Sequence, residues 1–122
     1  MVLCDANIFI HAFNGNPETL SKLSKIGYEH ITLSAITVME LYQGMGNKRE
    51  LRVMKENIQY FPIKHIIGTI SLKAVELLEK FNLSPGLLIP DAIIATSAII
   101  EQAPLYTYNK KDFVFIQEIE LS

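Results

Sequence analysis

The chain has 122 residues, 49% of them apolar and 20% charged, with 13 acidic against 11 basic side chains and a net charge of −2. This length fits one domain with a sizeable core, and the near-neutral charge excludes a strongly basic sleeve for nucleic acid. The single cysteine, Cys4, excludes an intramolecular disulfide and favours a reducing compartment. No basic region precedes the first apolar residues, and the most apolar segment, residues 92–100, is shorter than the roughly 20 residues that cross a bilayer. We therefore expect one cytoplasmic domain over residues 1–122.

Short apolar runs alternate with amphipathic segments along the chain. The runs predict strands at residues 2–4, 30–33, 61–67 and 105–108, with at most an edge strand at 114–119. Helical spacing and capping residues predict helices at residues 7–13, 18–26, 35–45, 48–59, 71–81 and 91–102, and a turn or short helix at 109–113. This alternation predicts an α/β fold with a parallel sheet covered on both faces, whose usual site is the crevice at the carboxyl ends of the strands.

Apolar spacing also predicts which faces of two helices point into the core. Leu51, Met54 and Ile58 recur at helical spacing within residues 48–59, so we expect them to pack inward. Within residues 71–81 the side chains expected toward the core are Leu72, Val75, Leu77 and Leu78. Helix 91–102 is apolar nearly all round, which predicts burial on several sides.

The chain has only three aspartates, against ten glutamates, and each aspartate stands at the boundary of a predicted strand or helix. Asp5 closes the first strand, Asp91 opens the most apolar helix, and Asp112 follows the last clear strand. Glu40 is the fourth candidate, because no residue three or four positions away can pair with its charge, while Glu76 has lysines at both distances. An acid among apolar neighbours is costly unless a cation or polar group meets it.

Simpler structural roles remain open for each of these residues. Asp5 and Asp91 are suitable helix N-caps, which contribute about 1 kcal/mol each. Glu40 can reach solvent, and Asp112 can be an ordinary turn residue. Asn7 and Ser34 are expected to be caps first and site residues second.

If the four acids converge, their repulsion raises their pKa values or opens the fold unless a cation lies between them. Oxygen ligands without histidine or cysteine point to Mg²⁺ or Mn²⁺. Such an ion keeps several waters and suits phosphodiester hydrolysis, because it polarises the phosphoryl oxygens and activates an attacking water.

Four segments of the chain resemble the PIN domain family and, within it, the VapC-type toxin ribonucleases. They are LCDAN at residues 3–7, the segment 33–41 that begins with LS and ends with MEL, PDAIIA at 90–95, and TYNKKDF at 107–113. Their order and spacing span nearly the whole chain. One departure is Ala6, where a hydroxyl residue is common in the family, so a supporting hydrogen bond is expected to be missing.

The resemblance implies a flavodoxin-like, three-layer fold with a parallel sheet of four to five strands. It implies that Asp5, Glu40, Asp91 and Asp112 are both the catalytic residues and the ligands of one or two Mg²⁺ (or Mn²⁺) ions. It further implies endonucleolytic cleavage of RNA, a homodimer, and neutralisation by a cognate antitoxin protein. Residues at positions that support the site are Asn7, Ser34, Thr107 and Asn109.

Other polar and aromatic residues give weaker indications of function. Lys110 and Lys111 flank the expected site, so they are candidates to contact the RNA backbone that the carboxylates repel. Lys48, Arg52 and Lys55 line up at helical spacing, which is more typical of a solvated face. The histidines have no metal-binding spacing, and the tyrosines are expected to be core or interface residues.

Two other functions are consistent with parts of this pattern. A non-catalytic PIN-type domain that binds RNA or serves as a scaffold would keep the fold without turnover. A phosphoacceptor receiver domain has similar length and alternation, but it needs an acidic pair after the first strand and an aspartate at the end of the third. Here Asp5 stands alone, and the third predicted strand ends at Ile67 without an acid.

Overall fold

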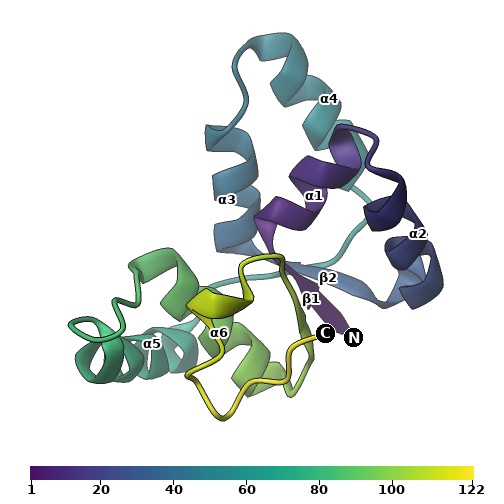
Figure 1. Ribbon diagram of the computed structural model, residues 1–122. Coiled ribbons are helices and arrows are strands. Elements are labelled where there is room, and N and C mark those ends of the chain that lie inside the picture. The colour runs from purple at the N-terminus through teal and green to yellow at the C-terminus, as the bar shows by residue number, and fades with distance from the viewer.

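Four short parallel strands form the centre of the computed structural model, which describes residues 1–122 (Figure 1). The strands are β1 (Val2–Cys4), β2 (Ile31–Ser34), β3 (Ile63–Lys64) and β4 (Leu105–Tyr106). Their spatial order is β3-β2-β1-β4, and Leu3 pairs with Thr32 on one side and with Leu105 on the other. The predicted parallel α/β sheet is confirmed, with four strands.

Helices cover both faces of this sheet. They are α1 (Ala6–Phe13), α2 (Pro17–Ile26), α3 (Ala35–Gln43), α4 (Lys48–Ile58), α5 (Gly68–Phe81) and α6 (Ile89–Glu101), with short 3₁₀ turns η1 (Tyr28–His30) and η2 (Lys110–Asp112). Figure 1 shows α1 to α4 on one side of the strands and α5 and α6 on the other. None of these helices combines the length and apolar character needed to cross a bilayer.

The order of the strands explains this division of helices. The chain steps from β1 to β2 and β3 in one direction and then returns to add β4 on the opposite side of β1. Crossovers between parallel strands are right-handed, so a reversal of direction moves the connecting helices to the other face. The reversal occurs between β1 and β4, at the switch point where ligands bind in sheets of this type.

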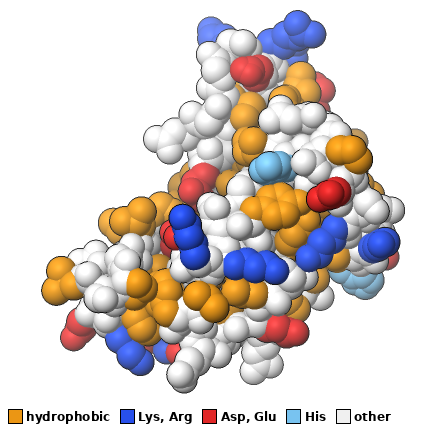
Figure 2. Space-filling model, in the orientation of Figure 1, with side chains coloured by type: hydrophobic (Ala, Val, Ile, Leu, Met, Phe, Trp, Pro, Cys, Tyr) orange, Lys and Arg blue, Asp and Glu red, His pale blue; other side chains and the backbone are white.

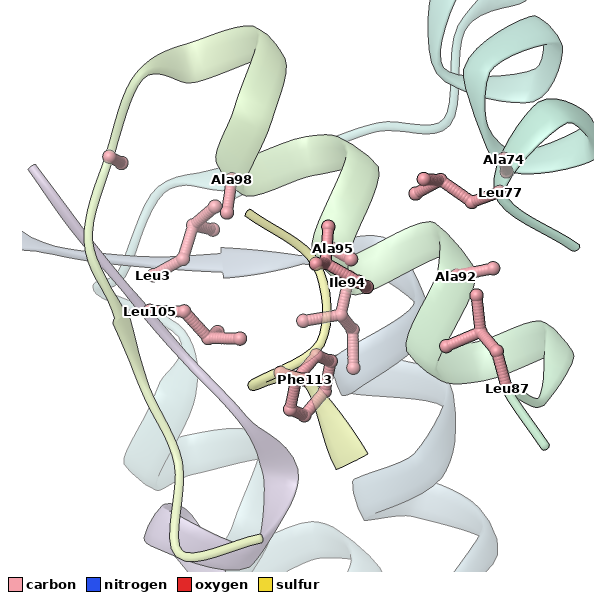
Figure 3. Close-up of a cluster of buried hydrophobic side chains, with 12 residues drawn as sticks. Leu3, Ala74, Leu77, Leu87, Ala92, Ile94, Ala95, Ala98, Leu105 and Phe113 are labelled. Carbon is pink, nitrogen blue, oxygen red and sulfur yellow. The ribbon is translucent and has the colours of Figure 1, made fainter. Parts of the chain in front are cut away.

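Each face of the sheet has its own apolar core. Side chains alternate along a strand, so Leu3 and Leu105 face α6 while Cys4 and Tyr106 face α1. Figure 3 shows Leu3 and Leu105 directed toward α6 and Phe113. The α6-side core comprises the buried residues Leu3, Ala74, Leu77, Leu87, Ala92, Ile94, Ala95, Ala98, Ala103, Leu105, Phe113 and Ile116. Burial of α6 on several sides is therefore as predicted.

The predicted inward face of α5 is wrong in part. Leu72 and Val75 are 72% and 61% exposed, whereas Ile70, Ala74 and Leu77 are buried. The helix carries two apolar stripes, and contact with α6 selects the one that contains the small residue Ala74. In α4, Met54 and Ile58 are buried as predicted, but Leu51 is 38% exposed.

The predicted strands near the edges of the sheet are shorter than expected or absent. Of residues 61–67 only Ile63–Lys64 pair, because β3 is an edge strand with one neighbour. Residues 114–119 form no strand: their backbone bonds are local, with the Ile116 N–H donating to the Phe113 carbonyl. Phe113 and Ile116 then both reach the core, and pairing beside β4 comes instead from Leu121, which forms an isolated bridge with Leu105.

Candidate functional site

Polar side chains gather where β1, β2 and β4 end. Asp5 follows β1, Ser34 closes β2 and Thr107 follows β4, and all three are buried. Since β1 is the central neighbour of the other two strands, their carboxyl ends lie side by side at the switch point.

Asp5 is held rigidly by three donors. Its Oδ1 accepts from the Ala6 N–H at 2.8 Å, so Asp5 is the N-cap of α1, as one prediction proposed. Its Oδ2 accepts from Thr107 Oγ1 at 2.9 Å and from Asn7 Nδ2 at 3.2 Å. Burial raises the pKa of the Asp5 carboxyl, these hydrogen bonds oppose that rise, and the charge of Asp112 adds to it.

Thr107 and Asn7 tie the segment after β4 to the start of α1. Thr107 Oγ1 accepts from Asn7 Nδ2 at 3.3 Å and from the Asn109 N–H at 3.1 Å, while Asn7 Oδ1 accepts from the Tyr108 N–H at 3.1 Å. The prediction that Asn7 is a helix cap is wrong, because it lies inside α1, where its side chain can bridge the two segments. Asn109 contributes its backbone N–H to this network.

Glu40 enters the cluster from α3, the helix that Ser34 caps. Ser34 Oγ accepts from the Ile36 N–H at 3.3 Å, which confirms Ser34 as the N-cap. Glu40 Oε1 is buried and has no hydrogen-bond partner. Burial, followed by the charges of Asp5 and Asp91, raises the pKa of the Glu40 carboxyl to about 7.

Asp91 lies in the first turn of α6, not at its N-cap as one prediction proposed. The helix begins at Ile89 after the cap residue Leu88, because Pro90 is favoured in the first helical positions. Burial, followed by the charges of Asp5 and Asp112, raises the pKa of the Asp91 carboxyl to about 6.

Asp112 completes the group from η2. Asp91, Lys111 and Asp112 line a small cleft of about 90 Å³ beside Pro85 and Gly86. The pKa values of Asp5, Glu40 and Asp91 each respond to the charge of at least one other acid of this group, although the elements that carry them are far apart in the sequence. The charges of Asp5, Glu40, Asp91 and Asp112 therefore act on one another in the folded chain, and we call these four residues the acidic cluster.

None of the four acids forms an ion pair. The ion pairs of the structure involve Glu29, Glu101 and Glu118. A depression of about 690 Å³ between α5 and the C-terminal segment is larger than the acidic cleft, but none of the four acids lines it. The absence of basic partners leaves the repulsion among the acids without an internal counter-charge.

The donor set fits a hard divalent cation. The side chains present carboxylate oxygen, and one buried oxygen, Glu40 Oε1, has no partner within the protein. No group of three His, Cys, Asp or Glu side chains is arranged as a ready-made ligand set. This arrangement suits Mg²⁺, which commonly takes one or two carboxylates and completes its coordination with water and substrate oxygens.

Basic side chains flank the acidic cluster on the surface. Lys110 and Lys111 are exposed on η2. Figure 2 shows a row of Lys and Arg side chains that crosses this face from the η2 segment toward α2, with acidic side chains beside its η2 end. By contrast, burial raises the pKa of the Cys4 thiol to about 12, as expected for an inert buried cysteine.

Two residues near the Asp5 network, Tyr108 and His11, were not among the predicted site residues. Tyr108 and His11 are both exposed and form an edge-to-face pair with ring centroids 4.9 Å apart. Asn7 and His11 are four residues apart on α1, so they lie on the same helical face, and this spacing is the signal that relates them.

Known proteins resemble this chain over nearly its whole length. The family model described as PIN domain matches residues 2–117. The chain is 30% identical to a protein named Ribonuclease VapC1 from Methanocaldococcus jannaschii, over 98% of this chain and 84% of that protein. Among solved structures, a toxin–antitoxin complex from Klebsiella pneumoniae is 29% identical, with a TM-score of 0.83 over 98% of this chain and 95% of that chain. VapBC2 from Rickettsia felis bound to a promoter DNA fragment shares the fold, with 24% identity, a TM-score of 0.85, and 100% and 98% coverage.

Proposed function

Because the chain belongs to the PIN domain family and its clustered carboxyl groups have no basic partner, we propose that it is a Mg²⁺-dependent endoribonuclease and the toxin of a toxin–antitoxin pair. The observation that carries the proposal is the group of four acids drawn from the end of β1 and from α3, α6 and η2. Acids that repel one another in a half-buried crevice are stabilised by a cation.

The four acids would together bind the metal ion. Asp5, Glu40, Asp91 and Asp112 are the residues that would hold Mg²⁺, one or two of them directly and the others through water, and Asp5 is the most firmly oriented of them. When bound, Mg²⁺ supplies polarisation of the scissile phosphate and lowers the pKa of an attacking water. Glu40 Oε1 has no internal donor, so this oxygen would be free to bind the ion or to accept a proton once the carboxyl is ionised.

The neighbouring side chains orient these acids and the substrate. Thr107 and Asn7 fix the Asp5 carboxylate through its Oδ2, and the helix cap at Ser34 fixes the start of α3, which carries Glu40. Lys111 lines the same cleft as Asp91 and Asp112, where it would contact a phosphate oxygen of the RNA, and Lys110 would contact a neighbouring phosphate.

The experiment compares cleavage of an unstructured RNA by the wild-type chain in Mg²⁺ and in EDTA. Asp91→Asn and Glu40→Gln should abolish cleavage, while Glu79→Gln, on the exposed side of α5, should leave it unchanged. RNA that binds but is never cut would favour the non-catalytic PIN-type domain. Cleavage that persists equally in EDTA would rule out the metal-dependent mechanism.

The toxin role predicts a protein partner as well as an RNA substrate. An apolar groove of about 290 Å³ lies between α1, α2 and α4, lined by Phe9, Ala12, Phe13, Leu20, Leu23, Tyr28, Met54, Asn57, Ile58 and Phe61. We assign it to an apolar segment of the antitoxin, because the Klebsiella relative is a toxin–antitoxin complex. Expression of the chain alone should arrest growth, and the arrest should disappear with Asp91→Asn. Growth that is equally fast with both versions would contradict the toxin role.

Exposed apolar residues of α5, and of the stretch from the end of α5 to the first residue of α6, suit the interface of a homodimer. They are Leu72, Val75, Leu83, Leu88 and Ile89, each more than half exposed. A second copy of the chain would bury apolar side chains that are otherwise exposed to water. Leu72→Glu should convert a dimer to a monomer in light scattering, while Leu51→Glu, on α4, should leave the dimer intact.

A further inference from the structure

Tyr108 is an exposed aromatic residue that directly follows Thr107 of the Asp5 network. Its side chain lies on the surface, 43% exposed. Its backbone N–H donates to Asn7 Oδ1 at 3.1 Å, and Asn7 in turn donates to Asp5 Oδ2. The backbone of Tyr108 is therefore tied to the same network that orients Asp5.

The ring is held in place from several directions. The Tyr108 hydroxyl is hydrogen-bonded to the Tyr106 hydroxyl at 3.0 Å and to Thr19 Oγ1. His11 and Tyr106 meet it edge to face, with centroids 4.9 Å and 5.7 Å away. A ring that is immobilised in this way loses little further entropy when a flat ligand stacks on it.

Basic side chains of α2 lie next to the rings of Tyr106 and Tyr108 on one side. Lys22 Nζ lies 4.2 Å from the centre of the Tyr106 ring, one turn of α2 from Thr19. Lys22 and Lys25 line a shallow depression on α2, which also contains one acid, Glu18. The row of basic side chains in Figure 2 runs across this part of the surface, between η2 and α2.

We propose that Tyr108 and His11 form a stacking subsite for a base of single-stranded RNA, with the adjoining phosphates over Lys110 and Lys22. The subsite rests on the proposed ribonuclease function and specifies how the substrate enters the site. Single-stranded RNA is bound by this combination of an aromatic face and a basic surface, since unpaired bases expose their faces for stacking. The bound base would position the neighbouring phosphodiester next to the four acids.

The test measures binding of a fluorescent single-stranded RNA in EDTA, where no metal-dependent cleavage occurs. Tyr108→Ala should weaken binding on the order of tenfold to a hundredfold, the usual cost of losing a stacked base. Tyr108→Phe keeps the ring and should bind within about twofold of wild type. Tyr60→Ala, which removes an 85% exposed tyrosine elsewhere, is the matched control and should change nothing.

Two further measurements separate stacking from a structural role. An oligonucleotide with abasic positions should bind wild type and Tyr108→Ala equally, whereas a purely structural defect would still weaken its binding. If Tyr108→Ala does not fold, Tyr108→Leu retains apolar bulk without an aromatic face and takes its place. Ultraviolet crosslinking of the unmodified protein should attach RNA at Tyr108.

Failure of this proposal is distinct from failure of the ribonuclease proposal. If RNA is cut in Mg²⁺ but Tyr108→Ala binds and cleaves it like wild type, the stacking subsite is wrong and the nuclease stands. If RNA binds in a Tyr108-dependent manner but is never cut, the subsite stands and the nuclease is wrong. Loss of antitoxin binding by Tyr108→Ala, with RNA binding intact, would assign this surface to the protein partner instead.

Discussion

The acidic cluster has two sides, Asp5 on one and Glu40 with Asp91 on the other, which differ in the hydrogen bonds that the protein donates to the carboxyl group. Asp5 is surrounded by donors from Ala6, Asn7 and Thr107. Glu40 and Asp91 have no hydrogen bond or ion pair that compensates their burial, and their pKa values rise to about 7 and about 6. The difference indicates that the fold itself positions Asp5, whereas the other side depends on something the protein alone does not supply.

Substitution of one acid on each side should have the largest effect and should separate the two sides. Asp5→Asn and Asp91→Asn should each lower RNA cleavage at least about a hundredfold. Without metal, however, Asp91→Asn should raise the melting temperature at neutral pH, because it removes a repelled charge. Asp5→Asn should lower it, since an amide NH₂ would face the donors Thr107 and Asn7. Calorimetry and cleavage assays on the same preparations measure both effects, and equal stability changes would contradict the comparison.

Metal binding should stabilise the protein more at high pH than at low pH. Glu40 and Asp91 have folded-state pKa values above their ordinary values of 4.5 and 3.8. The stability that they contribute is thus fully present below about pH 4 and is lost as the pH rises through 6 to 7. Mg²⁺ should therefore raise the melting temperature more at about pH 8 than at about pH 5. A shift that is the same at both values would contradict the role of these two groups.

The Asp5 side can be tested by removing one donor. Thr107→Val deletes the hydroxyl that donates to Asp5 Oδ2 and should lower the free energy of unfolding by about 1–2 kcal/mol. Thr96→Val is the matched control, because the Thr96 hydroxyl is buried without any partner, so its loss should be neutral or stabilising. Urea denaturation of the two variants measures the difference, and equal losses would show that the hydroxyl bond to Asp5 contributes nothing.

The smallest effect is expected from the flanking lysines, which are exposed. Lys110→Gln and Lys111→Gln should weaken RNA binding severalfold at low salt. Each substitution should also reduce the salt dependence of binding by about one counterion, because one phosphate is no longer neutralised. Lys48→Gln on α4 should not change this dependence. Binding at several salt concentrations checks the prediction, and a variant with an unaltered slope would remove that lysine from the RNA path.

Much of the candidate site was predictable because its signals are local. Asp5 and Ser34 follow apolar strands and cap helices, and Glu40 has no basic neighbour within one helical turn. The position of Asp91 was predicted less well, since Pro90 moved the start of α6 two residues upstream of it. The contact between Tyr108 and His11 could not be predicted, because it joins the segment after β4 to α1 across about a hundred residues.

The sequence by itself determined the strand and helix order, the parallel sheet, and which acids stand at the ends of elements. These features follow from apolar periodicity and capping chemistry, which act over a few residues. Only the tertiary structure decided which apolar stripe of α5 is buried, that residues 114–119 turn instead of pairing, and that Asn7 bridges Asp5 to Thr107. The physical reason is that each of these outcomes depends on which partner surface a side chain meets, and distant segments provide that surface.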